Sequence, residues 1–127
     1  MILGIGVDMV SVRRVEQSLE RFGDRFARKV LSAEELARYR DASLPAAFLA
    51  KRFAAKEAVA KALGTGMRAG VHFVQITIAR KKSGAPSIEL SGAARQRADK
   101  LGVGTIHISI SDEADHAIAL AVMERSD

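Results

Sequence analysis

The segment from Phe48 to Gly66, FLAKRFAAKEAVAKALGTG, most constrains how this chain of 127 residues can fold. It is rich in strong helix formers, Pro45 precedes it, and two glycines end it, so it predicts one helix. At about 100° per residue its large apolar side chains share one broad face, and Arg52 and Lys56 fall inside that face. Because a buried unpaired charge is costly, both cations need anionic partners.

Two kinds of partner satisfy this requirement. The cations can pair with carboxylates of the same chain, or lay their stems on the core while their charged heads reach water. Alternatively, the anions belong to a bound ligand. The helix alone leaves these alternatives open. Glu57 and Lys61 lie one turn apart at the edge of the same face.

Composition narrows the class of protein. With 48% hydrophobic residues the chain is globular, and its length suits a single domain over residues 1–127. There is no Cys, which excludes disulfides, thiolate metal sites and a Cys nucleophile. No apolar run is long enough to span a bilayer and the N-terminus lacks the features of a signal peptide, so we expect a cytoplasmic protein without a membrane partner. The net charge of +5 favours polyanionic partners.

The N-terminal stretch Ile2–Asp8, ILGIGVD, predicts a short buried strand. Gly4 and Gly6 inside it indicate close approach of another backbone or of a ligand. We expect the strand to end at Asp8. Its carboxylate then either caps the helix that follows or ligates a metal ion.

Residues 11–22 predict an amphipathic helix with a basic face that continues past its end. Arg14, Arg21 and Arg25 lie on this face. One interpretation is a solvated charged face, neutralised in part by the glutamates of the same helix. The other is a docking surface for an acidic helix.

The rest of the chain predicts alternating elements of both kinds. Ser32 and Glu35 form a capping box that begins a helix ending near Arg40. Residues 71–79 and 87–90 read as two strands of a hairpin, and residues 92–101 read as a helix.

The two final strands differ in pattern. Residues 105–111, TIHISIS, alternate strictly, so His107 shares a face with serines and a threonine. Residues 117–123, AIALAVM, are continuously apolar and suit burial on both faces. In order, the chain predicts a strand, three helices, a hairpin, a helix and two strands, which is an α+β fold with a mainly antiparallel sheet and helices packed on it. So many apolar strands in a short chain favour an oligomer.

Common catalytic motifs are missing: there is no GxGxxG, P-loop, HExxH, GxSxG or zinc spacing. What remains is a pair of carboxylates, Asp8 and Glu57, with Arg52, Lys56 and Lys61 beside a Gly-Thr-Gly turn. Mg²⁺ is often held by one or two carboxylates together with substrate phosphates, and cationic side chains stabilise a phosphoryl group in transfer. These residues suit metal-assisted chemistry on a phosphate ester.

Three segments, GIGVDMVSVRRVE, FLAKRFAAKEAVAKALGTG and IHISISDEADHAIALAV, occur in this order over nearly the whole chain. In this it closely resembles holo-acyl-carrier-protein synthases, the small bacterial type of 4′-phosphopantetheinyl transferase. The resemblance implies the transferase fold and an enzyme that moves 4′-phosphopantetheine from coenzyme A to a serine of apo acyl carrier protein. The by-product is adenosine 3′,5′-bisphosphate. Mg²⁺ is required, and the family forms homotrimers with active sites between subunits.

The resemblance also implies site residues. Asp8 and Glu57 match the magnesium ligands, and Lys61 matches the lysine that contacts the coenzyme A pyrophosphate. Coenzyme A binding is implied for Arg52, Lys61, Gly64, Pro86 and His107. Carrier-protein docking is implied for Arg14, Arg21, Phe22 and the adjacent Arg25.

Three assignments stay open at this point. Lys56 either touches the ligand or holds Glu57. Many members carry a second His where this chain has Asp112, so the general base is either Asp112 or Glu57 acting through a water. The identity of the carrier proteins and acyl-coenzyme A donors is also open.

Two alternative functions compete with this interpretation. A nucleic-acid-binding module would explain the basic charge, but the chain lacks aromatic residues interleaved on a strand and any known nucleic-acid motif, so we expect no nucleic-acid partner. An interaction protein of the same fold without catalysis is disfavoured by the intact Asp8, Glu57 and Lys61.

Overall fold

The structure is a computed structural model that describes residues 1–126. Its elements in chain order are β1 (Ile2–Ser11), α1 (Val12–Phe22), α2 (Asp24–Val30), α3 (Ala33–Arg40), α4 (Pro45–Ala62), a 3₁₀ turn η1 (Phe73–Gln75), β2 (Ile76–Arg80), β3 (Pro86–Leu90), α5 (Gly92–Leu101), β4 (Val103–Asp112) and β5 (His116–Arg125). The predicted α+β class is confirmed.

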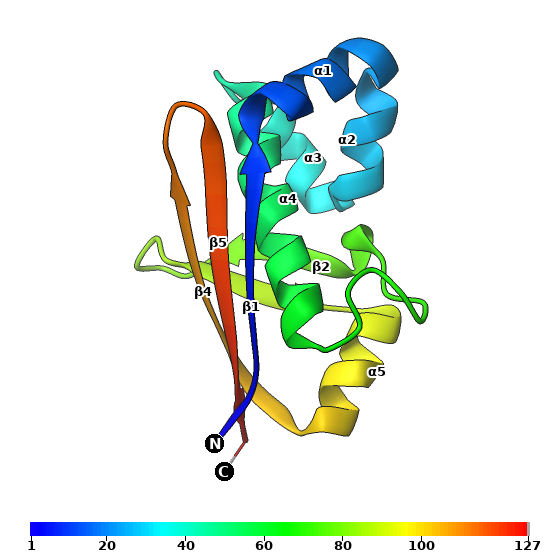
Figure 1. Cartoon of the computed structure of the whole chain (residues 1–127), viewed down its shortest axis with the longest axis vertical. Helices are drawn as coiled ribbons and strands as arrows, with labels where there is room; N and C mark the ends of the chain where they lie inside the picture. The colour runs from blue at the N-terminus through cyan, green and yellow to red at the C-terminus, as the bar shows by residue number, and fades with distance from the viewer. Residues whose placement is uncertain (127) are drawn as a thin grey trace.

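The strands form two antiparallel sheets. β1, β5 and β4 make a three-stranded sheet with β5 in the centre, and the β2–β3 hairpin forms a separate two-stranded sheet. The long helix α4 runs along one face of the larger sheet, and the other helices lie on that same side (Figure 1). Within residues 1–126, no helix combines the length and the apolar composition needed to cross a membrane.

Close packing of α4 on β1 depends on small residues. A Cβ atom added at Gly4 would collide with the carbonyl oxygen of Ala62, and one added at Gly6 with that of Ala58. The predicted close approach at these glycines is therefore confirmed, and the approaching group is the backbone of α4. It brings the end of β1 next to the C-terminal half of α4.

The central strand β5 is buried on one face only in the single chain. Its alanines at 117, 119 and 121 are fully buried, whereas Ile118 and Leu120 on the opposite face are 42% and 39% exposed. The expectation of burial on both faces is therefore wrong for the isolated chain. The reason is that α4 packs on the alanine face and the other helices lie on the same side of the sheet (Figure 1).

The predicted end and burial of β1 are wrong, and one of the two alternatives for Asp8 is excluded. Ile2, Ile5 and Val7 of this strand are exposed. The strand does not end at Asp8 but pairs with β5 as far as Ser11, opposite His116. The cap of α1 is Ser11, whose Oγ accepts a hydrogen bond of 3.3 Å from the backbone N–H of Arg14. Asp8 is therefore not a helix cap, and its carboxylate is available for other contacts.

The sequence pattern missed a helix and misplaced a strand. α2 follows α1 directly after Gly23, whose φ of +59° breaks the helical path, so four helices rather than three precede the hairpin. β2 begins at Ile76 and not at Val71. The cause is Gln75, whose Oε1 accepts from the backbone N–H groups of His72 and Ala94 and holds this segment as a turn.

Other predicted elements are confirmed. The capping box of α3 is present, and the backbone N–H of Ser32 donates to Glu35 Oε1 over 2.9 Å. α5 ends at Gly102, which has a left-handed φ of +82°. The side chains of β4 alternate between half-buried isoleucines and exposed polar residues that include His107.

Glu35 is the centre of a buried polar network that also settles the role of Lys56. Lys56 Nζ lies 2.6 Å from Glu35 Oε1, and both side chains are essentially inaccessible to water. Lys56 also donates to the backbone carbonyls of Val30 and, over 3.1 Å, of Phe73. It therefore pairs with a carboxylate of its own chain and contacts neither Glu57 nor the cavity described below.

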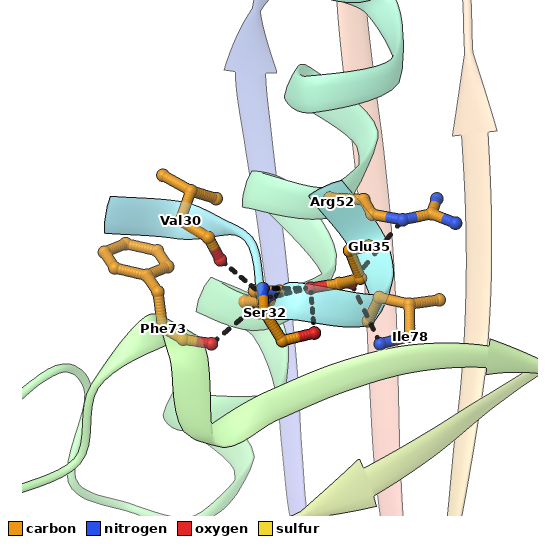
Figure 2. A network of polar contacts seen from close by, with 7 residues as sticks. Val30, Ser32, Glu35, Arg52, Phe73 and Ile78 are labelled. Atoms are coloured by element: carbon orange, nitrogen blue, oxygen red, sulfur yellow. Dashed lines mark hydrogen bonds and ion pairs between the residues drawn. The ribbon is translucent and has the colours of Figure 1, made fainter. Parts of the chain in front are cut away.

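The second oxygen of Glu35 binds two further groups (Figure 2). Oε2 accepts a hydrogen bond of 3.0 Å from the backbone N–H of Ile78 and lies 3.5 Å from Arg52 Nε. One carboxylate thus joins α3, α4 and β2.

We predict that Glu35→Gln destabilises the fold by about 3–5 kcal/mol, because removing one charge leaves Lys56 uncompensated in a dry site. The free energy of unfolding in urea measures this effect. The matched control is Glu34→Gln on the exposed neighbouring residue, which should change stability by less than about 0.5 kcal/mol. Equal effects of the two changes would contradict a buried ion pair.

Candidate active site

Asp8 on β1 and Lys61 on α4 meet at the edge of the three-stranded sheet. Lys61 Nζ lies 3.1 Å from Asp8 Oδ1 and donates a second hydrogen bond of 3.1 Å to the backbone carbonyl of Val7. The Asp8 side chain is 17% exposed and the Lys61 side chain 49%. The pair is therefore open to solvent, and an arriving anion can attract Lys61 away from Asp8.

Glu57 lies one turn before Lys61 on α4 and completes the cluster. Burial raises its pKa, the negative charge of Asp8 raises it further, and Lys61 opposes the rise. Glu57 is thus a carboxylate whose ionised form is disfavoured where it sits. A cation placed between the two carboxylates would relieve this cost.

The cluster opens into a cavity of about 620 Å³. Asp8, Glu57 and Lys61 line it together with Arg14 of α1. An apolar wall stands beside these charges and includes Val15, Phe26 and Phe53. The rings of Phe26 and Phe53 pack with their centroids 6.3 Å apart. The cavity therefore offers charged groups beside a surface suited to an uncharged chain.

The other residues predicted to bind coenzyme A lie outside this cavity. Gly64 follows α4 with a φ of +82°, Pro86 begins β3, and His107 projects from β4 and lies 2.8 Å from Glu124. Arg52 is 4% exposed, and its guanidinium carbon lies 4.2 Å from the Phe48 ring centroid. Within a single chain these residues do not meet the Asp8 cluster.

Arg52 has an unusual environment. Burial lowers its pKa, Glu35 opposes that change, and the positive charges of Arg80 and Arg38 lower it further. Its Nε is buried without a hydrogen-bond partner among the described residues. Arg52 is therefore paired with Glu35 on one side, while the nearby positive charges of Arg38 and Arg80 would favour a bound anion.

The predicted docking residues form an exposed face on α1 and the start of α2. Arg14, Arg21, Phe22 and Arg25 are all exposed, and the Arg21 guanidinium lies 5.1 Å from the Phe22 ring centroid. No carboxylate of residues 1–126 forms an ion pair with these arginines. The ion pairs with the glutamates of α1 that the first interpretation allowed are therefore not formed among the described residues.

Sequence reasoning missed His116, which also lines the cavity. Its position depends on the register that places it opposite Ser11, and no spacing along the chain reveals that pairing. Asp112, a candidate base, is exposed at the end of β4 and does not line the cavity.

Comparison with known proteins agrees with this arrangement. The family model of the 4′-phosphopantetheinyl transferase superfamily matches residues 4–121. A Vibrio cholerae serotype O1 protein named holo-[acyl-carrier-protein] synthase is 47% identical over 125 residues, covering 98% of this chain and 99% of that protein.

Solved structures give the same result. The crystal structure of holo-[acyl-carrier-protein] synthase from Neisseria meningitidis has a TM-score of 0.92 and 42% identity, covering 98% of this chain and 100% of that chain. The Helicobacter pylori holo-[acyl-carrier-protein] synthase in complex with coenzyme A has a TM-score of 0.82 and 34% identity, covering 94% and 99%.

The fold and these relatives define a small α+β transferase. The chain belongs to the 4′-phosphopantetheinyl transferase superfamily.

We predict that Glu57→Gln stabilises the protein in EDTA at neutral pH while it abolishes catalysis. Because folding raises the pKa of Glu57, the folded state holds this proton more tightly than the unfolded state does. The unaltered protein therefore loses stability relative to the variant as the pH rises from 4.5, the ordinary pKa of a Glu side chain, through the raised pKa of Glu57. Thermal unfolding of both proteins across this range measures the difference.

Glu34→Gln serves as the control, since this side chain is exposed and distant from the cavity lining. The difference in stability between Glu34→Gln and the unaltered protein should not grow as the pH rises. A Glu57→Gln variant that loses stability at neutral pH would contradict the disfavoured charge.

Proposed function

We propose that this chain transfers 4′-phosphopantetheine from coenzyme A to a serine of apo acyl carrier protein and releases adenosine 3′,5′-bisphosphate. Near-complete coverage at 47% identity by a holo-[acyl-carrier-protein] synthase supports the reaction class. The observation that carries the proposal is the cluster of Asp8, Glu57 and Lys61 at one cavity. The products are holo acyl carrier protein and the bisphosphate.

Asp8 and Glu57 are the residues that would hold Mg²⁺. The raised pKa of Glu57 supports this, because it shows that Lys61 alone does not offset the negative charges of Glu57 and Asp8. A bound cation would offset them. Residues 1–126 contain no cluster of three or more His, Cys, Asp or Glu side chains suited to a metal. Two carboxylates plus substrate phosphates suit Mg²⁺, which when bound would polarise the phosphate under attack.

Lys61 and the apolar wall would bind the pyrophosphate and the pantetheine arm of coenzyme A. Lys61 is half exposed beside Asp8, so its ammonium group can swing to the pyrophosphate and offset charge on the departing bisphosphate. The wall of Val15, Phe26 and Phe53 suits the uncharged pantetheine arm and excludes water from the reacting phosphate.

Arg52 would bind the nucleotide end of coenzyme A, by its 3′-phosphate. Arg52 Nε is buried without a hydrogen bond, although it lies 3.5 Å from Glu35 Oε2, and the nearby positive charges of Arg38 and Arg80 support an anion at this place. His107, Gly64 and Pro86 complete the proposed coenzyme site. Since they do not share the cavity in one chain, the proposal includes a site built between two subunits.

A homotrimer is the proposed assembly. The sheet face opposite α4 exposes Ile5, Val7 and Met9 on β1 by 58–65%, next to Ile118 and Leu120 of β5. Such a contiguous apolar face is typical of an interface between subunits. The cytoplasmic location and the single domain over residues 1–127 stay predictions.

The exposed basic face would receive the carrier protein. Arg14, Arg21 and Arg25 carry uncompensated charge, and Phe22 is 48% exposed among them. An acidic helix with an apolar side chain is complementary to this face. Because Arg14 also lines the cavity, a carrier docked here would present its serine to Asp8 and Glu57.

The experiment that tests the reaction incubates the purified protein with coenzyme A, Mg²⁺ and an apo acyl carrier protein. Mass spectrometry of the carrier should show the gain of one phosphopantetheine, and EDTA should abolish it. Light scattering on the same sample should report the mass of three chains. No gain with several carriers would sink the proposed activity, and an active monomer would remove the trimer from it.

We predict that Arg14→Glu combined with Arg21→Glu raises the KM for the carrier at least tenfold, since two attractive charges become repulsive. The dissociation constant of coenzyme A should change less than twofold. The control is Arg95→Glu on α5, an exposed arginine that pairs only with Asp99. An unchanged carrier KM in the double variant would identify the basic face as merely solvated.

A further inference from the structure

His116 is the one titratable side chain lining the 620 Å³ cavity that the proposed function does not use. It begins β5, and its cross-strand partner is Ser11, where β1 ends and α1 begins. The β4–β5 turn lies at the same end of the sheet as the start of α1 (Figure 1). His116 is exposed, whereas Glu57 is half-buried. A serine entering with a docked carrier therefore has access to the imidazole.

The other titratable groups of the cavity are unsuited to accept the serine proton. Asp8 and Glu57 are engaged by the cation in the proposed function, and a ligating carboxylate has its basicity reduced. Arg14 and Lys61 are cations without a free lone pair. His116 is the remaining proton acceptor among the described lining residues.

The alternatives outside the cavity are less well placed. Asp112 is exposed at the end of β4 and lines no part of the cavity. His107 on β4 is hydrogen-bonded to Glu124 of β5, and His72 directly precedes η1. Histidine is also the side chain whose unperturbed pKa suits proton transfer near neutral pH.

We infer that His116 is the general base of the transfer reaction, an inference that rests on the proposed function. A ring nitrogen of His116 takes the proton from the carrier serine hydroxyl. The serine oxygen forms a bond to the β-phosphorus of coenzyme A, and the bond from that phosphorus to the bridging oxygen breaks. The bridging oxygen leaves with the electron pair as part of adenosine 3′,5′-bisphosphate, and the imidazolium returns its proton to solvent.

Charged side chains on several neighbouring elements surround His116. The carboxylates of Asp8 and Glu57 and the cations Arg14 of α1 and Lys61 of α4 line the same cavity. On the β4–β5 turn, the carboxylates of Asp112, Glu113 and Asp115 add negative charge, and the backbone N–H of Glu113 donates to the carbonyl of His116.

The test compares His116→Gln with the unaltered protein in single-turnover transfer at saturating coenzyme A and carrier. We expect the rate to fall about 100-fold, in line with the usual contribution of a general base. We expect the rate of the unaltered protein to fall towards acid pH and the rate of the variant to lack this fall. Coenzyme A affinity and carrier affinity should each stay within about twofold, since Gln keeps a hydrogen-bonding side chain of similar reach.

A second variant separates chemistry from structure. His116→Ala should recover transfer when imidazole is added, because the cavity is open and imidazole can replace the missing base. His72→Gln, outside the cavity, should transfer at the normal rate. A transfer rate of His116→Gln within threefold of normal, or a raised carrier KM without a slower chemical step, would overturn the assignment. If the unaltered protein transfers nothing, the proposed function itself fails and this inference falls with it.

Discussion

The buried carboxylate of Glu35 is the interaction on which the rest of the structure depends. It compensates Lys56 in the core, reaches Arg52, and accepts from the backbone of Ile78 (Figure 2). Lys56 immediately precedes Glu57 on α4, and neighbouring residues of a helix point about 100° apart. By holding Lys56 in the core, the network fixes the rotation of α4 about its axis. Glu57 and Lys61 then face the cavity.

The second constraint is the short distance between α4 and the sheet. Gly4 and Gly6 leave room for the carbonyls of Ala62 and Ala58, and the inward side chains of β5 are alanines. Small residues on both surfaces let the helix lie directly on the strands. That closeness brings Lys61 within 3.1 Å of Asp8, although the two residues are 53 positions apart in the chain. The site is therefore a consequence of core packing.

The one-sided sheet connects the fold to the proposed assembly. Helices cover the alanine face, while apolar side chains of β1 and β5 remain exposed on the other face. The residues proposed for the nucleotide end of coenzyme A also lie away from the Asp8 cavity. Both features have the same explanation if neighbouring subunits cover the free face and complete the site. The exposed arginines of α1 stay outside that face, where a carrier protein can reach them.

The sequence by itself determined the features that depend on neighbours along the chain. These include the helix of residues 92–101, the capping box at Ser32, the alternation of β4 and the small residues at Gly4 and Gly6. Periodicity and capping chemistry are local, so they can be recognised without a fold. The family resemblance selected Asp8, Glu57 and Lys61, and the structure brings these three together.

Only the tertiary structure decided which groups meet across the fold. It paired Lys56 with Glu35 and made Ser11, not Asp8, the cap of α1. It also placed residues 73–75 in a 3₁₀ turn before β2 and not in the strand itself. It also brought His116 to the cavity through strand register. These outcomes depend on distances between segments far apart in the chain. A sequence shows that a buried charge requires a partner, but the packing of helices and strands selects which one.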